Sequence, residues 1–284
     1  MPTLDEFKEF VRASCSPNSN LPGSYMRALR HVTKFLNNCI PKYASLPPVW
    51  EISSLDVIEE LYVFVKDEEK KGAASAFCRS NLPRSYLTHR YCTNALKAFG
   101  RFLSSAKMEN EAISIFNSTN EAESVACGIA EIRIPKPSLF LDDEVAVYSR
   151  EGKETLRQVR QRQNQNIFRR MVLMNYNNMC CVTGLPVKEA LRASHIVEWS
   201  KDEKIRLLPT NGLCLAATYD AAFDRHLISF DEDFRMILSS SLKEYFTNEV
   251  FNRTFRDFEG SRIKRALKFQ PSQEFLQRHR ELLK

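Results

Sequence analysis

Residues 180–231 read CCVTGLPVKEALRASHIVEWSKDEKIRLLPTNGLCLAATYDAAFDRHLISFD, and this stretch decides the fold of the C-terminal half. Its pattern predicts a strand, a turn and a second strand that ends at His195. A polar loop, the pair Asn211-Gly212 and an apolar stretch follow, and a helix is expected to begin at about Tyr219. Short strands followed directly by a helix predict a small α+β unit.

Two carboxylates on the predicted helix, Asp220 and Asp224, are four residues apart. Side chains at this spacing lie on one helix face, with Cβ atoms about 5–6 Å apart. Such a pair of hard oxygen ligands suits Mg²⁺, which keeps several waters and takes few protein carboxylates. A histidine on the neighbouring strand, His195, could then deprotonate water beside a metal-bound phosphate.

The same stretch resembles the HNH endonuclease domain, also called ββα-metal or His-Me finger, of bacterial restriction and defence nucleases. The similarity runs from about Arg162 to the end of the chain, somewhat under half of its length. Several short pieces match, and their occurrence together in this order is far more specific for the family than any one piece alone. They are Cys181-Val-Thr-Gly184, Ala193-Ser-His-Ile196 with Trp199, Asn211-Gly-Leu213, Asp220-Ala-Ala-Phe-Asp224 and Leu227-Ile-Ser-Phe230, with Phe168-Arg-Arg before them and Arg278-His-Arg-Glu281 after them.

The resemblance implies a role for each matching site residue. His195 matches the histidine that acts as general base, and Asn211 matches the asparagine that holds the loop carrying that base. Asp220 and Asp224 occupy the metal-ligand region, so the cofactor expected is Mg²⁺ or another divalent cation such as Mn²⁺. The implied fold is an N-terminal helical domain followed by a C-terminal ββα-metal nuclease domain with flanking helices, an α+β architecture.

This sequence departs from the family pattern at three positions. The last residue of the motif is often histidine, yet no histidine lies between residues 196 and 225. Ser194 stands where many relatives have an aspartate ligand, and His226 stands where relatives often have glycine. The ligand set is therefore less firmly implied than the base, and Ser194, Thr218 and His226 are the next ligand candidates.

Each site residue also has a structural interpretation. A histidine in an apolar strand is commonly a packed core residue, and Asn-Gly is a turn signal anywhere. Asp220 could cap a helix, and Asp224 could pair with an arginine. The spacing of all four within one short stretch favours the catalytic interpretation.

Charge is divided unequally between the two halves of the chain. Residues 1–150 hold 18 basic and 18 acidic side chains, whereas residues 151–284 hold 23 and 17. A basic half indicates a polyanionic partner. The Arg-rich first part of a helix predicted over 152–176 is either a phosphate-contacting arm or a solvated helix face. The candidate DNA contacts are Arg157, Arg160, Arg162, Arg192, Lys204, Arg206 and Arg225.

The N-terminal part is expected to be a helical domain over residues 1–110, with helices at 24–36, after Ser54 or Asp56, and at 85–103. Residues 111–150 are expected to be a linker with short extended segments, and residues 151–284 to form the nuclease domain with a C-terminal helical tail. The N-terminal domain would set DNA specificity or mediate dimerisation. Its candidates for base contacts are Arg27, Arg30, Arg84 and Arg90.

Composition limits the remaining function classes. No run of eighteen apolar residues occurs, and the first residues lack the features of a signal peptide, so a soluble cytoplasmic protein with no membrane partner is expected. The cysteines contain no C-x₂-C pair, which favours free thiols over structural zinc. The function expected is hydrolysis of double-stranded DNA by a type II restriction or related defence nuclease, which could act as a homodimer. The alternatives are a nonspecific DNA or RNA nuclease acting as effector or toxin, and a catalytically inactive DNA-binding protein.

Overall fold

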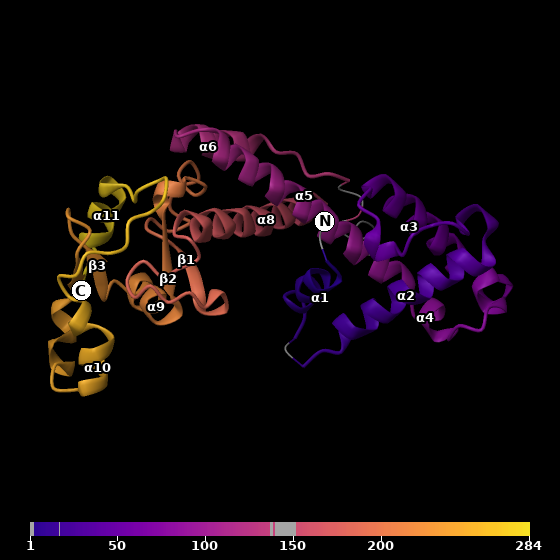
Figure 1. Cartoon of the computed structure of the whole chain (residues 1–284), viewed down its shortest axis with the longest axis horizontal. Helices are drawn as coiled ribbons and strands as arrows, with labels where there is room; N and C mark the ends of the chain where they lie inside the picture. Colours follow the sequence, from indigo (N-terminus) through magenta and orange to yellow (C-terminus); the bar gives the residue numbers. More distant parts are fainter. Residues whose placement is uncertain (1–2, 17, 137–138, 140–151) are drawn as a thin grey trace. The chain divides into compact units, whose positions relative to one another are not determined.

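The computed structural model describes residues 3–16, 18–136, 139 and 152–284. The chain divides into two compact units, one of Met1–Met108 with Arg133–Arg160 and one of Glu109–Ile132 with Gln161–Lys284. The first unit is helical, and the second adds two small antiparallel sheets, so the predicted α+β class is confirmed (Figure 1). Among the described residues, no helix has both the length and the apolar character needed to cross a membrane.

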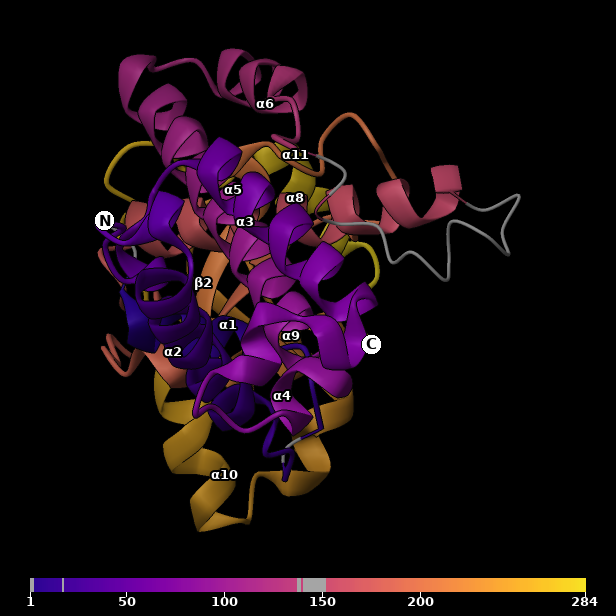
Figure 2. The same cartoon turned by 90° about the vertical axis from the view of Figure 1, so that its right-hand side faces the viewer.

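Helices packed around aromatic side chains form the first unit. Phe7 meets Phe99 edge-on, with ring centroids 5.2 Å apart, and Phe35 packs against Phe77 at 5.1 Å. The Ser54 hydroxyl accepts a hydrogen bond from the Val57 amide, which confirms Ser54 as a helix cap. The elements are α1 (Leu4–Arg12), α2 (Leu21–Cys39), α3 (Leu55–Lys70), α4 (Ser85–Thr88) and the first part of α5 (Tyr91–Ser118); α3 and α5 run side by side (Figure 2).

The helix predicted over 85–103 is divided in two. α4 ends at Thr88 and α5 begins at Tyr91. Between them Arg90 has a φ of 57°, in the left-handed region that cannot continue a right-handed helix. The chain therefore changes direction at Arg90.

The described start of the expected linker over 111–150 is helical. α5 continues to Ser118, and α6 (Ala122–Glu131) follows. Apolar side chains explain the difference, because Ala112 and Phe116 are four residues apart and both buried. Phe116 also packs against Phe269, with ring centroids 5.2 Å apart. α6 and the part of α5 from Glu109 onwards belong to the second unit. Of the short extended segments expected over 128–148, the first residues are the end of α6, and residues 137–138 and 140–148 lie outside the described residues.

The second unit combines helices with two small sheets. The predicted helix over 152–176 is present as α8 (Gly152–Asn175). The side chain of Asn175 is buried and holds the C-terminal segment, donating to the Phe269 carbonyl at 2.7 Å and accepting from the Phe269 amide at 3.1 Å. The remaining elements are β1 (Leu191–His195), β2 (Gly212–Ala216), α9 (Ala217–Asp224), β3 (Ile228–Phe230), β4 (Met236–Leu238), α10 (Glu249–Thr254) and α11 (Gln273–Arg280).

The strand that pairs with β1 comes after it and not before it. β1 and β2 are antiparallel with His195 opposite Gly212, and α9 packs against both strands (Figure 1). The first of the two expected strands, at the start of the segment 180–231, is not formed. The chain makes a turn there, in which the Gly184 amide donates to the Cys180 carbonyl at 2.8 Å. Gly184 has a φ of 77°, which glycine adopts without steric cost. The ββα order is thus β1, β2 and α9.

Candidate active site

His195 is the last residue of β1 and is enclosed by two aromatic rings. Its imidazole stacks on Phe168, with ring centroids 3.7 Å apart and an interplanar angle of 12°. Trp199 meets the imidazole edge-on at 5.3 Å, and the guanidinium of Arg206 lies 5.0 Å from the Trp199 ring centre. These contacts restrict the imidazole to one orientation.

One nitrogen of this imidazole has a backbone partner. Nε2 lies 3.0 Å from the carbonyl oxygen of Arg206. Because a carbonyl can only accept, Nε2 carries the proton and Nδ1 keeps its lone pair. Burial lowers the pKa of His195 to about 4, and the hydrogen bond to Arg206 opposes this shift only in part. His195 is therefore neutral near pH 7 and able to accept a proton at Nδ1.

Asn211 holds the loop that follows His195. Its side chain is fully buried, and its Oδ1 accepts a hydrogen bond from the Val197 amide at 2.8 Å. Its Nδ2 donates to the carbonyls of Val197 at 3.1 Å and Ile205 at 3.3 Å. Ile205 adjoins Arg206, so the amide braces the loop that supplies the carbonyl partner of His195.

Gly212 lets β2 approach α8 closely. A Cβ at this position would lie 2.4 Å from Val172 and 2.9 Å from Phe168, both closer than real Cβ contacts. Gly212 has an extended φ of −130°, so the Asn-Gly pair here begins a strand and is not a tight turn. Phe168 stacks on His195, so a side chain at position 212 that displaced Phe168 would also displace the imidazole.

Asp220 and Asp224 lie on α9 one helical turn apart and face the same cleft. Asp220 accepts a hydrogen bond from the hydroxyl of Ser194, on β1. Burial, followed by the charge of Asp220, raises the pKa of Asp224, so the two carboxylates repel each other. A cation between them would relieve this repulsion. Asp220 is not the helix cap, because Ala216 occupies that position.

The donor set fits a magnesium ion better than a metal that needs several protein ligands. Within the described residues, no three His, Cys, Asp or Glu side chains converge as a ligand group. Mg²⁺ keeps several waters and commonly binds through one or two carboxylates together with substrate phosphates. Asp220 and Asp224 would be the carboxylates that hold an ion bound in this way.

A cleft of about 580 Å³ brings these groups together. Two arginines also line it, Arg192 on β1 and Arg169 on α8. Burial and the neighbouring charge of Arg192 lower the pKa of Arg169, and Asp220 opposes the shift. The other lining residues are Gln165, Asn166, Phe168, Ala193, Ser194, His195, Glu198, Trp199, Asp220 and Asp224.

Of the seven predicted DNA contacts, Arg192 is the one that lines this cleft. Arg206 is engaged in the site's own structure, through Trp199 and an ion pair with Glu203 at 3.0 Å. Arg162, Lys204 and Arg225 are exposed, Arg160 is partly buried, and the side chain of Arg157 lies outside the described residues.

Sequence reasoning missed Arg169 and Glu198. Arg169 lies among the core-facing residues of α8, where its spacing from Gln165 marks a polar strip beside the buried face. Its guanidinium donates to the carbonyl of Leu191 at 2.9 Å, which ties α8 to the start of β1. Glu198 lines the cleft and pairs with Lys201 at 2.9 Å. Arg169 belongs to the matching piece Phe168-Arg-Arg but was given no role from the sequence, and no local pattern indicated Glu198.

His226 does not line the cleft, so the structure offers no support for it as a ligand. Its φ of 55° is the backbone conformation that favours glycine, the residue expected at this place. Its Nδ1 lies 3.2 Å from Nε2 of His279, a buried residue of α11.

Comparison with known proteins agrees with this geometry. No curated protein matches the chain. The family model described as HNH endonuclease matches residues 180–231, the segment that contains β1, β2, α9 and β3. Residues 180–231 are therefore an HNH endonuclease domain, which contains His195, Asn211, Asp220 and Asp224.

Proposed function

We propose that this protein is a metal-dependent DNA endonuclease, with His195 as general base and Asp220 and Asp224 as ligands of Mg²⁺ or another divalent cation such as Mn²⁺. The observation that carries the proposal is one cleft lined by a neutral histidine, two aspartates one helical turn apart and two arginines. These groups can serve as a general base, as metal ligands and as phosphate contacts in phosphodiester hydrolysis.

In this mechanism water attacks the phosphorus, a new P–O bond forms, and the bond to the leaving oxygen breaks. Nδ1 of His195 accepts the proton of the attacking water, and Asn211 keeps the imidazole and its carbonyl partner in register. Arg169 and Arg192 bind non-bridging oxygens of the phosphate. A divalent cation held by the aspartates would stabilise the negative charge that develops during the reaction.

The biological role proposed is that of a type II restriction or related defence nuclease acting on double-stranded DNA. A homodimer fits this role, because a palindromic site mirrors two-fold symmetry. The two other readings remain as outcomes of the test: a nonspecific DNA or RNA nuclease, and an inactive DNA-binding protein.

The test is digestion of a supercoiled plasmid by the full chain with Mg²⁺, with EDTA, and by the variant His195→Ala. Discrete fragments that need both Mg²⁺ and His195 support a sequence-specific nuclease. A smear that needs both Mg²⁺ and His195 supports a nonspecific nuclease. An RNA substrate digested in parallel shows whether that nuclease also cuts RNA. A gel shift without cutting in Mg²⁺ or Mn²⁺ would overturn the proposed activity and leave a binding protein.

A further inference from the structure

The first unit carries a row of cationic side chains along one exposed face of α2. Arg27, Arg30 and Lys34 are exposed and recur at helical spacing, so they lie on one face over about 10 Å of helix. The opposite face, with Leu29 and Leu36, is buried in the core. We call Arg27, Arg30 and Lys34 the α2 basic stripe.

No acidic side chain of α2 offsets this stripe. The segment between Glu9 and Glu51 contains no Asp or Glu, and neither does the segment between Glu69 and Glu109. Tyr86, on α4 in the second segment, joins the two. Its hydroxyl accepts a hydrogen bond from Nε of Arg27 at 2.9 Å, and its ring lies 4.6 Å from that of His31. The packing therefore brings two acid-free segments together.

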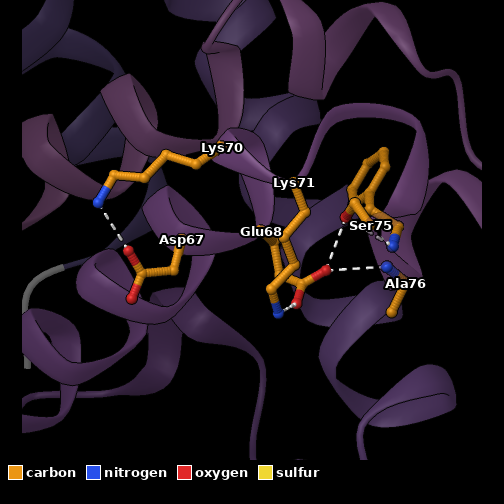
Figure 3. A network of polar contacts seen from close by, with 7 residues as sticks. Asp67, Glu68, Lys70, Lys71, Ser75 and Ala76 are labelled. Carbon is orange, nitrogen blue, oxygen red and sulfur yellow. Dashed lines mark hydrogen bonds and ion pairs between the residues drawn. The ribbon is translucent and has the colours of Figure 1, made fainter.

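The acidic residues of this unit are concentrated elsewhere. α3 carries six of them, and lysines form ion pairs with Asp56, Glu59, Glu60, Asp67 and Glu68. Figure 3 shows the C-terminal end of α3, where Lys70 pairs with Asp67 at 2.9 Å and Glu68 accepts from Lys71, Ser75 and Ala76. At the other end, Lys136 pairs with Asp56 at 2.7 Å and with Glu59 at 2.8 Å.

The stripe has no such partners. Across the described residues, no carboxylate forms an ion pair with Arg27, Arg30 or Lys34. Arg27 bonds only to neutral hydroxyls, those of Tyr86 and Ser24. The N-terminal half thus has a net charge near zero, although the α2 basic stripe has no ion-pair partner among the described residues.

We propose that the α2 basic stripe, with Tyr86 beside it, is a second DNA-binding surface that contacts the phosphate backbone. The partner follows from charge complementarity, because an acid-free cationic row with an aromatic side chain is complementary to a polyanion. The proposal rests on the proposed function, since double-stranded DNA is the polyanion on which that function acts. The role inferred for the first unit is therefore binding of the DNA phosphate backbone, in preference to dimerisation.

The test measures DNA affinity against salt concentration, in Ca²⁺, for the full chain carrying His195→Ala. The double variant Arg30→Gln/Lys34→Gln removes two exposed cations and no recorded hydrogen bond. Each lost phosphate contact should reduce the slope of log K against log salt by about 0.9, so a loss near 1.8 is expected. At 0.1 M salt the affinity should fall by roughly 10- to 100-fold.

The control is Lys42→Gln/Lys70→Gln, which changes net charge equally but affects lysines already paired, at 2.6 and 2.9 Å, with Glu60 and Asp67. Its salt slope should stay within about 0.5 of the parent's. An unchanged slope in Arg30→Gln/Lys34→Gln overturns the proposal, as does an equal loss in the control. Loss of a dimer by sedimentation with the slope unchanged would instead assign the stripe to assembly.

Failure of this inference can be distinguished from failure of the proposed function in the plasmid digest. If the wild-type chain cuts DNA but the stripe variant binds normally, the proposed function stands and this inference fails. If the wild-type chain never cuts DNA but binds it in a way that needs Arg30 and Lys34, the inference stands without the nuclease activity.

Discussion

Replacement of Asn211 by alanine tests whether the loop after His195 is held by one buried amide. Asn211→Ala removes three hydrogen bonds, to the Val197 amide and to the carbonyls of Val197 and Ile205. At about 1 kcal/mol net for each bond, the unfolding free energy of the second unit should fall by roughly 3 kcal/mol. Because the side chain is fully buried, water cannot simply replace these partners.

The effect on rate should exceed the effect on binding. The loop also carries the Arg206 carbonyl that orients His195, so its release misplaces the base. We expect the single-turnover cleavage rate to fall by about 10²-fold or more, within the range for loss of general-base catalysis, while DNA affinity changes less than about threefold. Affinity depends mainly on phosphate contacts, which the substitution leaves in place.

Three measurements check this prediction. Urea unfolding followed by fluorescence reports on the second unit through Trp199 when Trp50, in the first unit, is replaced by phenylalanine in all variants. Hydrogen exchange reports on the Val197 amide, and single-turnover kinetics report the rate. Asn248→Ala is the matched control, because Asn248 only caps α10 by accepting from the Phe251 amide at 2.9 Å; it should cost about 1 kcal/mol and leave cleavage intact. Unchanged protection of Val197 with more than half the wild-type rate in Asn211→Ala would refute the reasoning.

His195→Ala should slow cleavage by about 10²–10⁴-fold with DNA affinity nearly unchanged. Because burial lowers the pKa of His195 to about 4, the base stays neutral until the pH falls towards that value; an acid limb near pH 6.5 in the wild-type rate profile would contradict this. Asp220→Asn and Asp224→Asn should each weaken Mg²⁺ binding by calorimetry, and extra Mg²⁺ should partly rescue the cleavage rate of one; normal titrations for both would place the ligands elsewhere. Burial also lowers the pKa of His279 to about 4. The unfolded chain takes up a proton at this residue near pH 6.5 and the folded chain does not, so His279 should contribute up to about 3 kcal/mol to a decline in stability between pH 6.5 and 4. Because His195 contributes in the same direction, His279→Phe should reduce that decline in pH-dependent urea unfolding without removing it.

Local sequence pattern was sufficient for several parts of this structure. The four-residue spacing of Asp220 and Asp224 placed both on one face of α9, because helical geometry depends only on neighbouring residues. Ser54 was identified as a cap of α3 for the same reason. The order of motif residues within 180–231 was enough to indicate the HNH domain.

Local sequence pattern could not predict how segments far apart in the chain pair with each other. Which strand joins β1 depends on the register that places His195 opposite Gly212, and the apolar run of β2 is compatible with more than one partner. The turn at Cys180 likewise needed Gly184 in a left-handed conformation that no periodicity reveals. Helices also replaced the expected linker, because Phe116 finds its partner, Phe269, far along the chain.

By itself, the sequence determined which residue types form the nuclease motif and which of them share a helix face, because those relations span only a few residues. Only the tertiary structure decided that α8 brings Phe168 beneath His195 and Arg169 into the cleft, since these contacts join segments far apart in the chain. It likewise decided that Tyr86 of α4 lies beside the basic stripe of α2, and that lysines of other segments pair with the acids of α3. A sum of charges along the sequence cannot detect that separation, because the side chains that cancel in the sum lie on different surfaces.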